Sequence, residues 1–305
     1  MAAVEVRGLT RRFGPLTAVS DVTFEVDAGE LFGLVGPDGA GKTTTLRMLA
    51  GVLPPSEGDA IVAGCSVASE PDAVRPHIAY MAQRFGLYED LTVRENLDFY
   101  ADLYRVPTSE RPERLERLYA FSNLAEFEDR LAGNLSGGMK QKLSLSCALI
   151  HRPDILLLDE PTFGVDPISR RDLWLILHEM VAAGVTVIVS TAYLDEAERC
   201  DRVAFLHQGE VMALDDPETL QQSLPGAVLE VRADRPRAAR DALRSAADVR
   251  RATLFGETVH AVVGEDAGDE VVRRALDDAG VAVTEVRRVE ASLEDVFIER
   301  VADRG

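Results

Sequence analysis

The sequence has few cysteines and no long hydrophobic run, and both absences narrow the class of protein. Cys65, Cys147 and Cys200 are the only cysteines among 305 residues, and they lack the CxxC spacing of zinc or redox sites. This usage argues against a disulfide framework and fits a reducing cytoplasm. No apolar run approaches the ~20 residues of a membrane-spanning helix, and the N-terminal stretch lacks a signal-peptide core. We therefore expect the chain itself to stay outside the bilayer.

Positive charge is also scarce. The formal net charge is -19 at pH 7, so most of the surface would repel a phosphate backbone, and we expect no nucleic acid partner. The cations are almost all arginine, because the only lysines are Lys42, Lys140 and Lys142. Lys42 lies in a glycine-rich segment, where the slim point charge of lysine suits a phosphate.

Residues 1–222 have the pattern of an α/β domain. The apolar runs ILLLDE (155–160) and VTVIVST (185–191) predict buried parallel strands, joined by a crossover helix that ends at Gly184. The segment from about 86 to 150 reads as a helical subdomain, in which Thr92 and Glu95 form a capping-box pattern.

Residues 227–305 follow a different pattern, after a linker at Gln221–Gly226. They alternate in the order strand, helix, strand, strand, helix, strand, which is typical of a small α+β ferredoxin-like domain.

A glycine-rich loop follows the strand-like run LFGLV and opens a helix, the context that makes GxxxxGK[ST] a phosphate-binding loop. Its glycines let backbone amides face the phosphates, Lys42 would neutralise phosphate oxygens, and Thr43 would ligate Mg²⁺. The segment that we expect to bind the nucleotide consists of Gly36, Pro37, Asp38, Gly39, Ala40, Gly41, Lys42, Thr43 and Thr44.

Asp159 and Glu160 end the strand-like run at 155–160. A buried carboxylate at Asp159 needs a cation, and Mg²⁺ reached through water fits that need. Glu160 would point elsewhere and is suited to act as general base on the attacking water. A plain pair of solvated carboxylates at a strand end is the alternative.

A second glycine-rich segment, LSGGMKQK (135–142), precedes a helix and presents exposed amides at its start. Taken alone, it is an ordinary helix N-terminus capped by Ser136.

The order of these three motifs resembles the ATP-binding subunit of ABC transporters, over roughly the first 220 residues. The resemblance implies a P-loop domain of ABC type that binds ATP and Mg²⁺. It also implies roles for single residues. Leu135, Ser136, Gly137 and Gly138 would cap the ATP of a partner subunit, with Gln141 on the same surface.

Three further residues take roles from the resemblance. Gln83 would contact Mg²⁺ and the attacking water and relay to a membrane subunit. Phe13 would stack on adenine, with a core position as the alternative. Asp166 would sense the partner across the interface, or cap the helix that begins at Pro167, or both.

The sequence departs from the family at Ala192, where a histidine usually touches the γ-phosphate. A methyl group cannot donate a hydrogen bond, which puts hydrolysis at this chain's own site in doubt. Either a homodimer works on Glu160 alone, with Thr191 or Tyr193 substituting, or the chain pairs with a complete paralogue.

The closing segment SLEDVFIERV (292–301) resembles the drug and antibiotic resistance type of ABC exporter. This implies a subunit at the cytoplasmic face of the membrane, bound to a separate transmembrane permease and a second ATPase subunit, that powers export of a hydrophobic compound. The permease would dock near Gln83 and Phe85–Leu91. The alternatives are a soluble ABC ATPase that acts on ribosomes or DNA, and an importer ATPase with a regulatory C-terminal domain.

Overall fold

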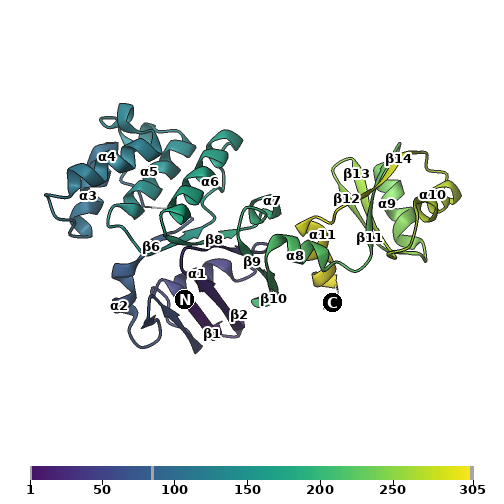
Figure 1. Cartoon of the computed structure of the whole chain (residues 1–305), viewed down its shortest axis with the longest axis horizontal. Helices are drawn as coiled ribbons and strands as arrows, with labels where there is room; N and C mark the ends of the chain where they lie inside the picture. Colours follow the sequence, from purple (N-terminus) through teal and green to yellow (C-terminus); the bar gives the residue numbers. More distant parts are fainter. Residues whose placement is uncertain (1, 84–85, 303–305) are drawn as a thin grey trace. The chain divides into compact units, whose positions relative to one another are not determined.

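The computed structural model describes residues 2–83 and 86–302, drawn in Figure 1. The chain divides into two compact units, Met1–Leu214 and Asp215–Gly305. The sequence pattern predicts this boundary slightly later, at residue 222. The division falls earlier because helix α8 (Pro217–Gln222) contacts α11 (Leu293–Ala302) of the C-terminal unit.

A six-stranded sheet forms the centre of the first unit, in the order β10-β9-β3-β8-β7-β6. The five strands from β9 to β6 pair in parallel. Every residue of β3, β7 and β8 is buried, as expected of strands covered on both faces. The strands are β3 (Leu31–Val35), β6 (Ile78–Met81), β7 (Ile155–Asp159), β8 (Thr186–Thr191), β9 (Arg202–His207) and β10 (Glu210–Asp215).

Four helices accompany this sheet, and a 3₁₀ turn follows one of them. They are α1 (Lys42–Leu49), α2 (Pro71–Val74), α6 (Pro167–Ala182), α7 (Leu194–Ala197) and the 3₁₀ turn Arg75–His77. Helix α6 is the expected crossover between β7 and β8, and Gly184 follows it with φ of 92°. Such a φ suits glycine, which has no Cβ to clash.

A second, antiparallel sheet has the order β2-β1-β4-β5. Its strands are β1 (Ala2–Phe13), β2 (Leu16–Asp27), β4 (Glu57–Val62) and β5 (Cys65–Ser66). One hydrophobic core joins this sheet to α1 and to the parallel sheet. In that core Phe24 of β2 stacks on Phe32 of β3, with ring centroids 5.2 Å apart.

The middle of the first unit is a helical subdomain, as expected for residues 86–150. It contains α3 (Val93–Leu103), α4 (Arg111–Ser122), α5 (Gly137–Leu149) and the 3₁₀ turns Ala125–Phe127 and Ala132–Asn134. These helices gather on one side of the parallel sheet in Figure 1. The predicted capping box is confirmed, because Thr92 Oγ1 accepts from Glu95 N and Glu95 Oε2 accepts from Thr92 N.

The C-terminal unit has the expected ferredoxin-like order. Its antiparallel sheet runs β12-β13-β11-β14, and α9 and α10 pack on it. Helix α11 follows as an addition to this order. The elements before it are α8, β11 (Ala227–Ala233), α9 (Pro236–Ser245), β12 (Val249–Phe255), β13 (Thr258–Val263), α10 (Asp269–Asp278) and β14 (Val283–Val289).

Candidate nucleotide-binding site

The glycine-rich loop joins β3 to α1, and two of its glycines are required by close packing. A Cβ at Gly36 would lie 2.2 Å from the carbonyl oxygen of Leu206, which no side chain tolerates. Gly41 has φ of 106°, and a Cβ there would lie 2.8 Å from the carbonyl oxygen of Ala18. The loop is therefore fixed in shape by its neighbours, and α1 begins directly behind it at Lys42.

Lys42 is buried beneath this loop, with a side chain only 4% exposed. Its ammonium group donates to the carbonyl oxygens of Gly36, at 2.6 Å, and Pro37, at 3.2 Å. Its Nζ also lies 3.2 Å from Glu160 Oε1. The loop and the strand-end carboxylate therefore meet at one cation.

Asp159, at the end of β7, is 1% exposed and accepts hydrogen bonds from three hydroxyl groups. Thr43 Oγ1 donates at 2.9 Å and Ser190 Oγ at 2.8 Å, both to Asp159 Oδ1. Burial raises the pKa of the nearby Tyr80, whose hydroxyl lies 3.5 Å from Asp159 Oδ2. A threonine hydroxyl beside a buried carboxylate is an all-oxygen donor set, so these residues fit Mg²⁺.

Glu160 is held by groups from three separate segments: Lys42 of α1, Gln83 after β6 and Ser190 of β8. Its Oε2 accepts from Gln83 Nε2 at 2.8 Å, while its backbone N–H donates to Ser190 Oγ at 3.0 Å. Its φ of 50° turns the chain sharply after β7. The carboxylate is thus oriented by Lys42 and Gln83 and lies apart from that of Asp159, as the sequence predicts.

Ser190 and Tyr80 are site residues that sequence reasoning missed. Ser190 stands opposite Asp159 in the parallel register of β7 and β8. Its position at the end of a neighbouring apolar strand was the available signal, since the carboxyl ends of parallel strands share one edge of a sheet. Nothing in the sequence singles out Tyr80.

A cavity of about 700 Å³ opens over the glycine-rich loop, Gln83 and Glu160. Phe13 lies at its edge and is 44% exposed, so the alternative that it is a core residue is wrong. The Arg11 guanidinium stands 4.7 Å from the centre of its ring. The cavity is lined by Phe13, Leu16, Thr17, Ala18, Asp38, Gly39, Ala40, Gly41, Lys42, Thr43, Thr44, Gln83, Glu160, Phe163 and Gln208.

The second glycine-rich segment lies away from this cavity, because none of the described residues 135–141 lines it. Ser136 caps α5 by accepting from Met139 N at 3.3 Å, so the N-cap reading is confirmed as a local role. Gly138 is buried against α6, where a Cβ would lie 2.1 Å from Ser169 Oγ. Ser136 and Gly137 stay exposed.

Asp166 caps α6, accepting from Ile168 N at 3.1 Å and Ser169 N at 3.0 Å. Hydrogen bonds from Ser169 lower the pKa of this carboxyl group. Phe163 and Ile168 beside it are 58% and 70% exposed. The capping role is confirmed, and the exposed apolar neighbours leave this loop suited to contact another chain.

Ala192 is exposed, directly after β8. Thr191 is buried, and its hydroxyl already has hydrogen-bond partners within the chain. It donates to Glu196 Oε2 at 2.7 Å and accepts from Tyr193 N at 3.0 Å. The Arg170 guanidinium covers the Tyr193 ring at 4.6 Å. The threonine hydroxyl therefore makes a poor substitute for the missing histidine.

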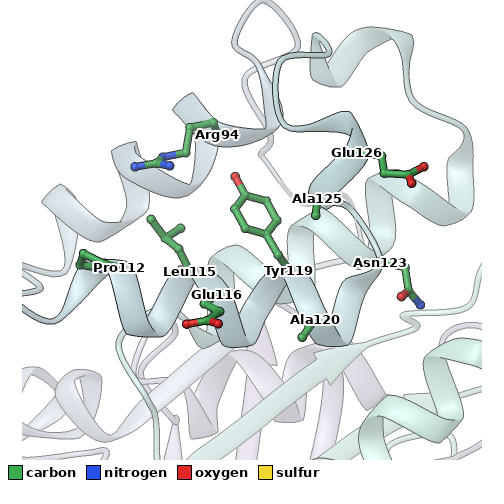
Figure 2. A pocket seen from close by; sticks show the side chains of 9 residues that line it. All are labelled: Arg94, Pro112, Leu115, Glu116, Tyr119, Ala120, Asn123, Ala125 and Glu126. Atoms are coloured by element: carbon green, nitrogen blue, oxygen red, sulfur yellow. The ribbon is translucent and has the colours of Figure 1, made fainter.

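A separate cavity of about 860 Å³ lies between α3 and α4, and Figure 2 shows its lining. Tyr119 points from α4 toward Arg94 of α3, and burial raises its pKa to about 12. The lining holds none of the predicted site residues. Among the described residues, no cluster of three or more His, Cys, Asp or Glu could hold a metal, and no helix is long and apolar enough to span a membrane.

Two family models match the chain. Residues 19–163 match that described as ABC transporter, and residues 216–301 match that described as ATP-binding protein DrrA1-3-like, C-terminal domain. Among solved structures, one described as the ATP-binding subunit of an ABC transporter is 33% identical with a TM-score of 0.66, and the match covers 72% of this chain and 92% of that one.

Curated relatives agree along the whole length. YbhF of Escherichia coli (strain K12), a probable multidrug ABC transporter ATP-binding protein, is 40% identical over all of this chain, which spans only 53% of that relative. The daunorubicin resistance ATP-binding protein DrrA2 of Streptomyces coeruleorubidus is 36% identical over 99% of this chain and 96% of its own. The Nod factor export ATP-binding protein I of Burkholderia lata is 36% identical over 98% and 96%. The chain thus belongs to the ATP-binding proteins of the ABC transporter family.

Proposed function

We propose that this chain binds and hydrolyses ATP to power a membrane ABC transporter that exports a hydrophobic compound. The observation that carries the proposal is the meeting of Lys42 and Glu160 at 3.2 Å below a glycine loop. ATP hydrolysis uses a cation at the transferred phosphate and a base for the attacking water, and the fold brings one of each to the same place.

The triphosphate would lie on the loop from Gly36 to Thr44, with adenine against Phe13. Thr43, Gln83 and Asp159 would hold Mg²⁺, with Asp159 acting through water. The ion would neutralise charge on the phosphate oxygens. Ser190 orients the carboxylate of Asp159 by donating a hydrogen bond to its Oδ1 at 2.8 Å.

Hydrolysis would begin when the γ-phosphate takes the place of Glu160 at Lys42. Phosphate oxygens carry more charge than a carboxylate and would compete for the same ammonium group. Glu160 would then be free to accept a proton from the attacking water, while Gln83 keeps hold of the carboxylate at 2.8 Å.

A second ATP-binding subunit would complete the site, with its own Ser136, Gly137 and Gly138 against the γ-phosphate and Gln141 nearby. The exposed residues Phe163 and Ile168 beside Asp166 would then be covered. We take a second copy of this chain as that partner. A solved bacterial ABC transporter cassette that is 26% identical, with a TM-score of 0.63, is dimeric.

The transport role rests on relatives whose names state multidrug transport, daunorubicin resistance and Nod factor export. The chain would work at the cytoplasmic face of the membrane, attached to a separate permease. We place the docking surface at Gln83 and residues 86–91. Phe85, which the sequence also placed there, lies outside the described residues.

Phosphate release by the purified full chain tests the enzymatic part of the proposal. We expect Mg²⁺-dependent release that disappears in Glu160→Gln and persists in Glu113→Gln, a control at an exposed glutamate of α4. Release that survives Glu160→Gln would refute the proposed base.

A further inference from the structure

The segment 89–93 pairs directly with the segment 130–133, which precedes the Ser136–Gly138 turn. Val93 N donates to Arg130 O at 3.0 Å, and Ala132 N donates to Leu91 O at 2.8 Å. Thr92 and Leu131 form an isolated antiparallel bridge between these bonds. The two segments are therefore one short ladder within the helical subdomain.

Glu89 closes the end of this ladder nearest the turn. Its carbonyl oxygen accepts from Gly133 N at 2.9 Å. A Cβ at Gly133 would lie 3.2 Å from that oxygen and 3.4 Å from Glu89 Cβ, so the two backbones are packed tightly. A displacement of the Glu89 backbone would therefore displace Gly133, which lies two residues before Leu135.

The Glu89 side chain contacts the other side of the same turn. Lys140 Nζ, in the first turns of α5, donates to Glu89 Oε1 at 2.9 Å. Lys140 is one of only three lysines, and each of the three forms an ion pair with a carboxylate in this unit. Glu89 thus contacts the chain both before and after Ser136–Gly138.

We infer that Glu89 is a positioning residue: it links the Ser136–Gly138 turn to the segment 89–93. The inference rests on the proposed function for its consequence, since this turn would face the ATP of the partner chain. The carboxylate is 68% exposed and the lysine 32% exposed. Because exposed ion pairs contribute little free energy, the Glu89–Lys140 pair favours one position of the turn without holding it rigidly.

Hydrogen exchange of the full chain, measured by mass spectrometry over peptides that cover 131–141, tests this link without requiring turnover. We expect Glu89→Lys and Lys140→Glu each to speed exchange there by roughly two- to fivefold. The double variant, which swaps the charges, should restore the wild-type rate. The matched control is Glu113→Lys, since Glu113 is equally exposed at 68% and pairs with Arg152 at the same 2.9 Å.

Two further readouts separate positioning from general destabilisation. The melting temperature and the Kd of the chain's own site for ATP should match wild type in all variants, while turnover falls in each single variant and recovers in the swap. Unchanged exchange in Glu89→Lys, or a swap no better than the single variants, would overturn the inference. A wild-type chain that fails to bind ATP would refute the proposed function and leave the exchange result intact.

Discussion

Lys42 Nζ lies 3.2 Å from Glu160 Oε1, and both side chains are largely buried, at 4% and 13% exposed. Under the proposed function, the carboxylate occupies the position at the ammonium group that the γ-phosphate would take. Binding of the triphosphate would then break a partly desolvated ion pair, which would cost affinity and at the same time release the base.

Replacing Glu160 by glutamine should tighten ATP binding while stopping hydrolysis. The neutral amide leaves Lys42 without a competing anion and removes a negative charge near the phosphates. We expect a Kd for ATP lower by about three- to tenfold, measured by calorimetry with Mg²⁺. Weaker binding in Glu160→Gln than in wild type would contradict the competition between carboxylate and phosphate.

Removing the Ser190 hydroxyl should weaken the Mg²⁺ site and the fold together. Ser190→Ala leaves Asp159 with one hydroxyl donor fewer and removes one of the two acceptors for the backbone N–H of Glu160, while the Ser190 carbonyl oxygen at 3.2 Å remains. We expect the free energy of unfolding to fall by about 1–3 kcal/mol in urea titrations. The apparent affinity for Mg²⁺ in the presence of ATP should fall as well.

Ser146→Ala is the matched control for this variant. Ser146 is equally buried, but its hydroxyl only donates to the Lys142 carbonyl oxygen within α5. It should change neither Mg²⁺ affinity nor turnover. Equal effects from the two substitutions would argue against a special role for Ser190.

Introducing histidine at position 192 should raise turnover. The imidazole could donate a hydrogen bond to the γ-phosphate, which the methyl group of Ala192 cannot. We expect kcat to rise roughly tenfold, with little change in KM for ATP, in a steady-state phosphate assay. Ala192→Leu adds bulk without a donor and should not raise kcat, so an equal gain from both variants would exclude the hydrogen bond as the cause.

Stability of the C-terminal unit should depend on pH through His260 and Asp295. The Nδ1 atom of the His260 ring lies 3.0 Å from Asp295 Oδ2, and Ser292 Oγ donates a hydrogen bond to the same oxygen at 2.7 Å. Burial alone would lower the pKa of His260, but Asp295 and then Glu230 raise it above 6.5. Burial alone would raise the pKa of Asp295, but His260 and Ser292 lower it below 3.8.

The sign of the pH dependence follows from these directions. A raised histidine pKa stabilises the fold fully below pH 6.5, and this contribution is lost as pH rises through the folded pKa. We expect His260→Gln to lower the melting temperature of the C-terminal unit by about 4–8 °C more at pH 5.5 than at pH 8.5, because a charged hydrogen bond adds about 1 kcal/mol. An equal loss at both pH values for His260→Gln would contradict the ion pair.

Sequence patterns were sufficient for the architecture because the strongest signals are local. The apolar runs that became β7 and β8 are buried at every position, and the Thr92–Glu95 capping box formed as its spacing predicts. The sequence indicates that Lys42 and Glu160 belong to one site, but it does not predict their direct contact. The two residues are 118 positions apart along the chain, and only the pairing of the parallel strands brings them together.

Three features of the site depend on tertiary contacts that a sequence does not display. Ser190 reaches Asp159 only because β8 lies beside β7 in register. The Thr191 hydroxyl cannot replace the missing histidine because it donates its hydrogen bond to Glu196. The Glu89–Lys140 pair joins the loop before α3 to the first turn of α5, and no sequence pattern predicts this contact.

Complementation between two inactive variants tests most directly whether two chains complete each other's ATP sites. Lys42→Ala should lose its own ATP site and keep an intact Ser136–Gly138 turn, and Gly137→Asp, at an exposed glycine with room for a Cβ, should show the reverse. We predict that an equimolar mixture releases phosphate at a substantial fraction of the wild-type rate, although each variant alone is inactive. A mixture no more active than its two components would contradict a site shared between two copies of this chain.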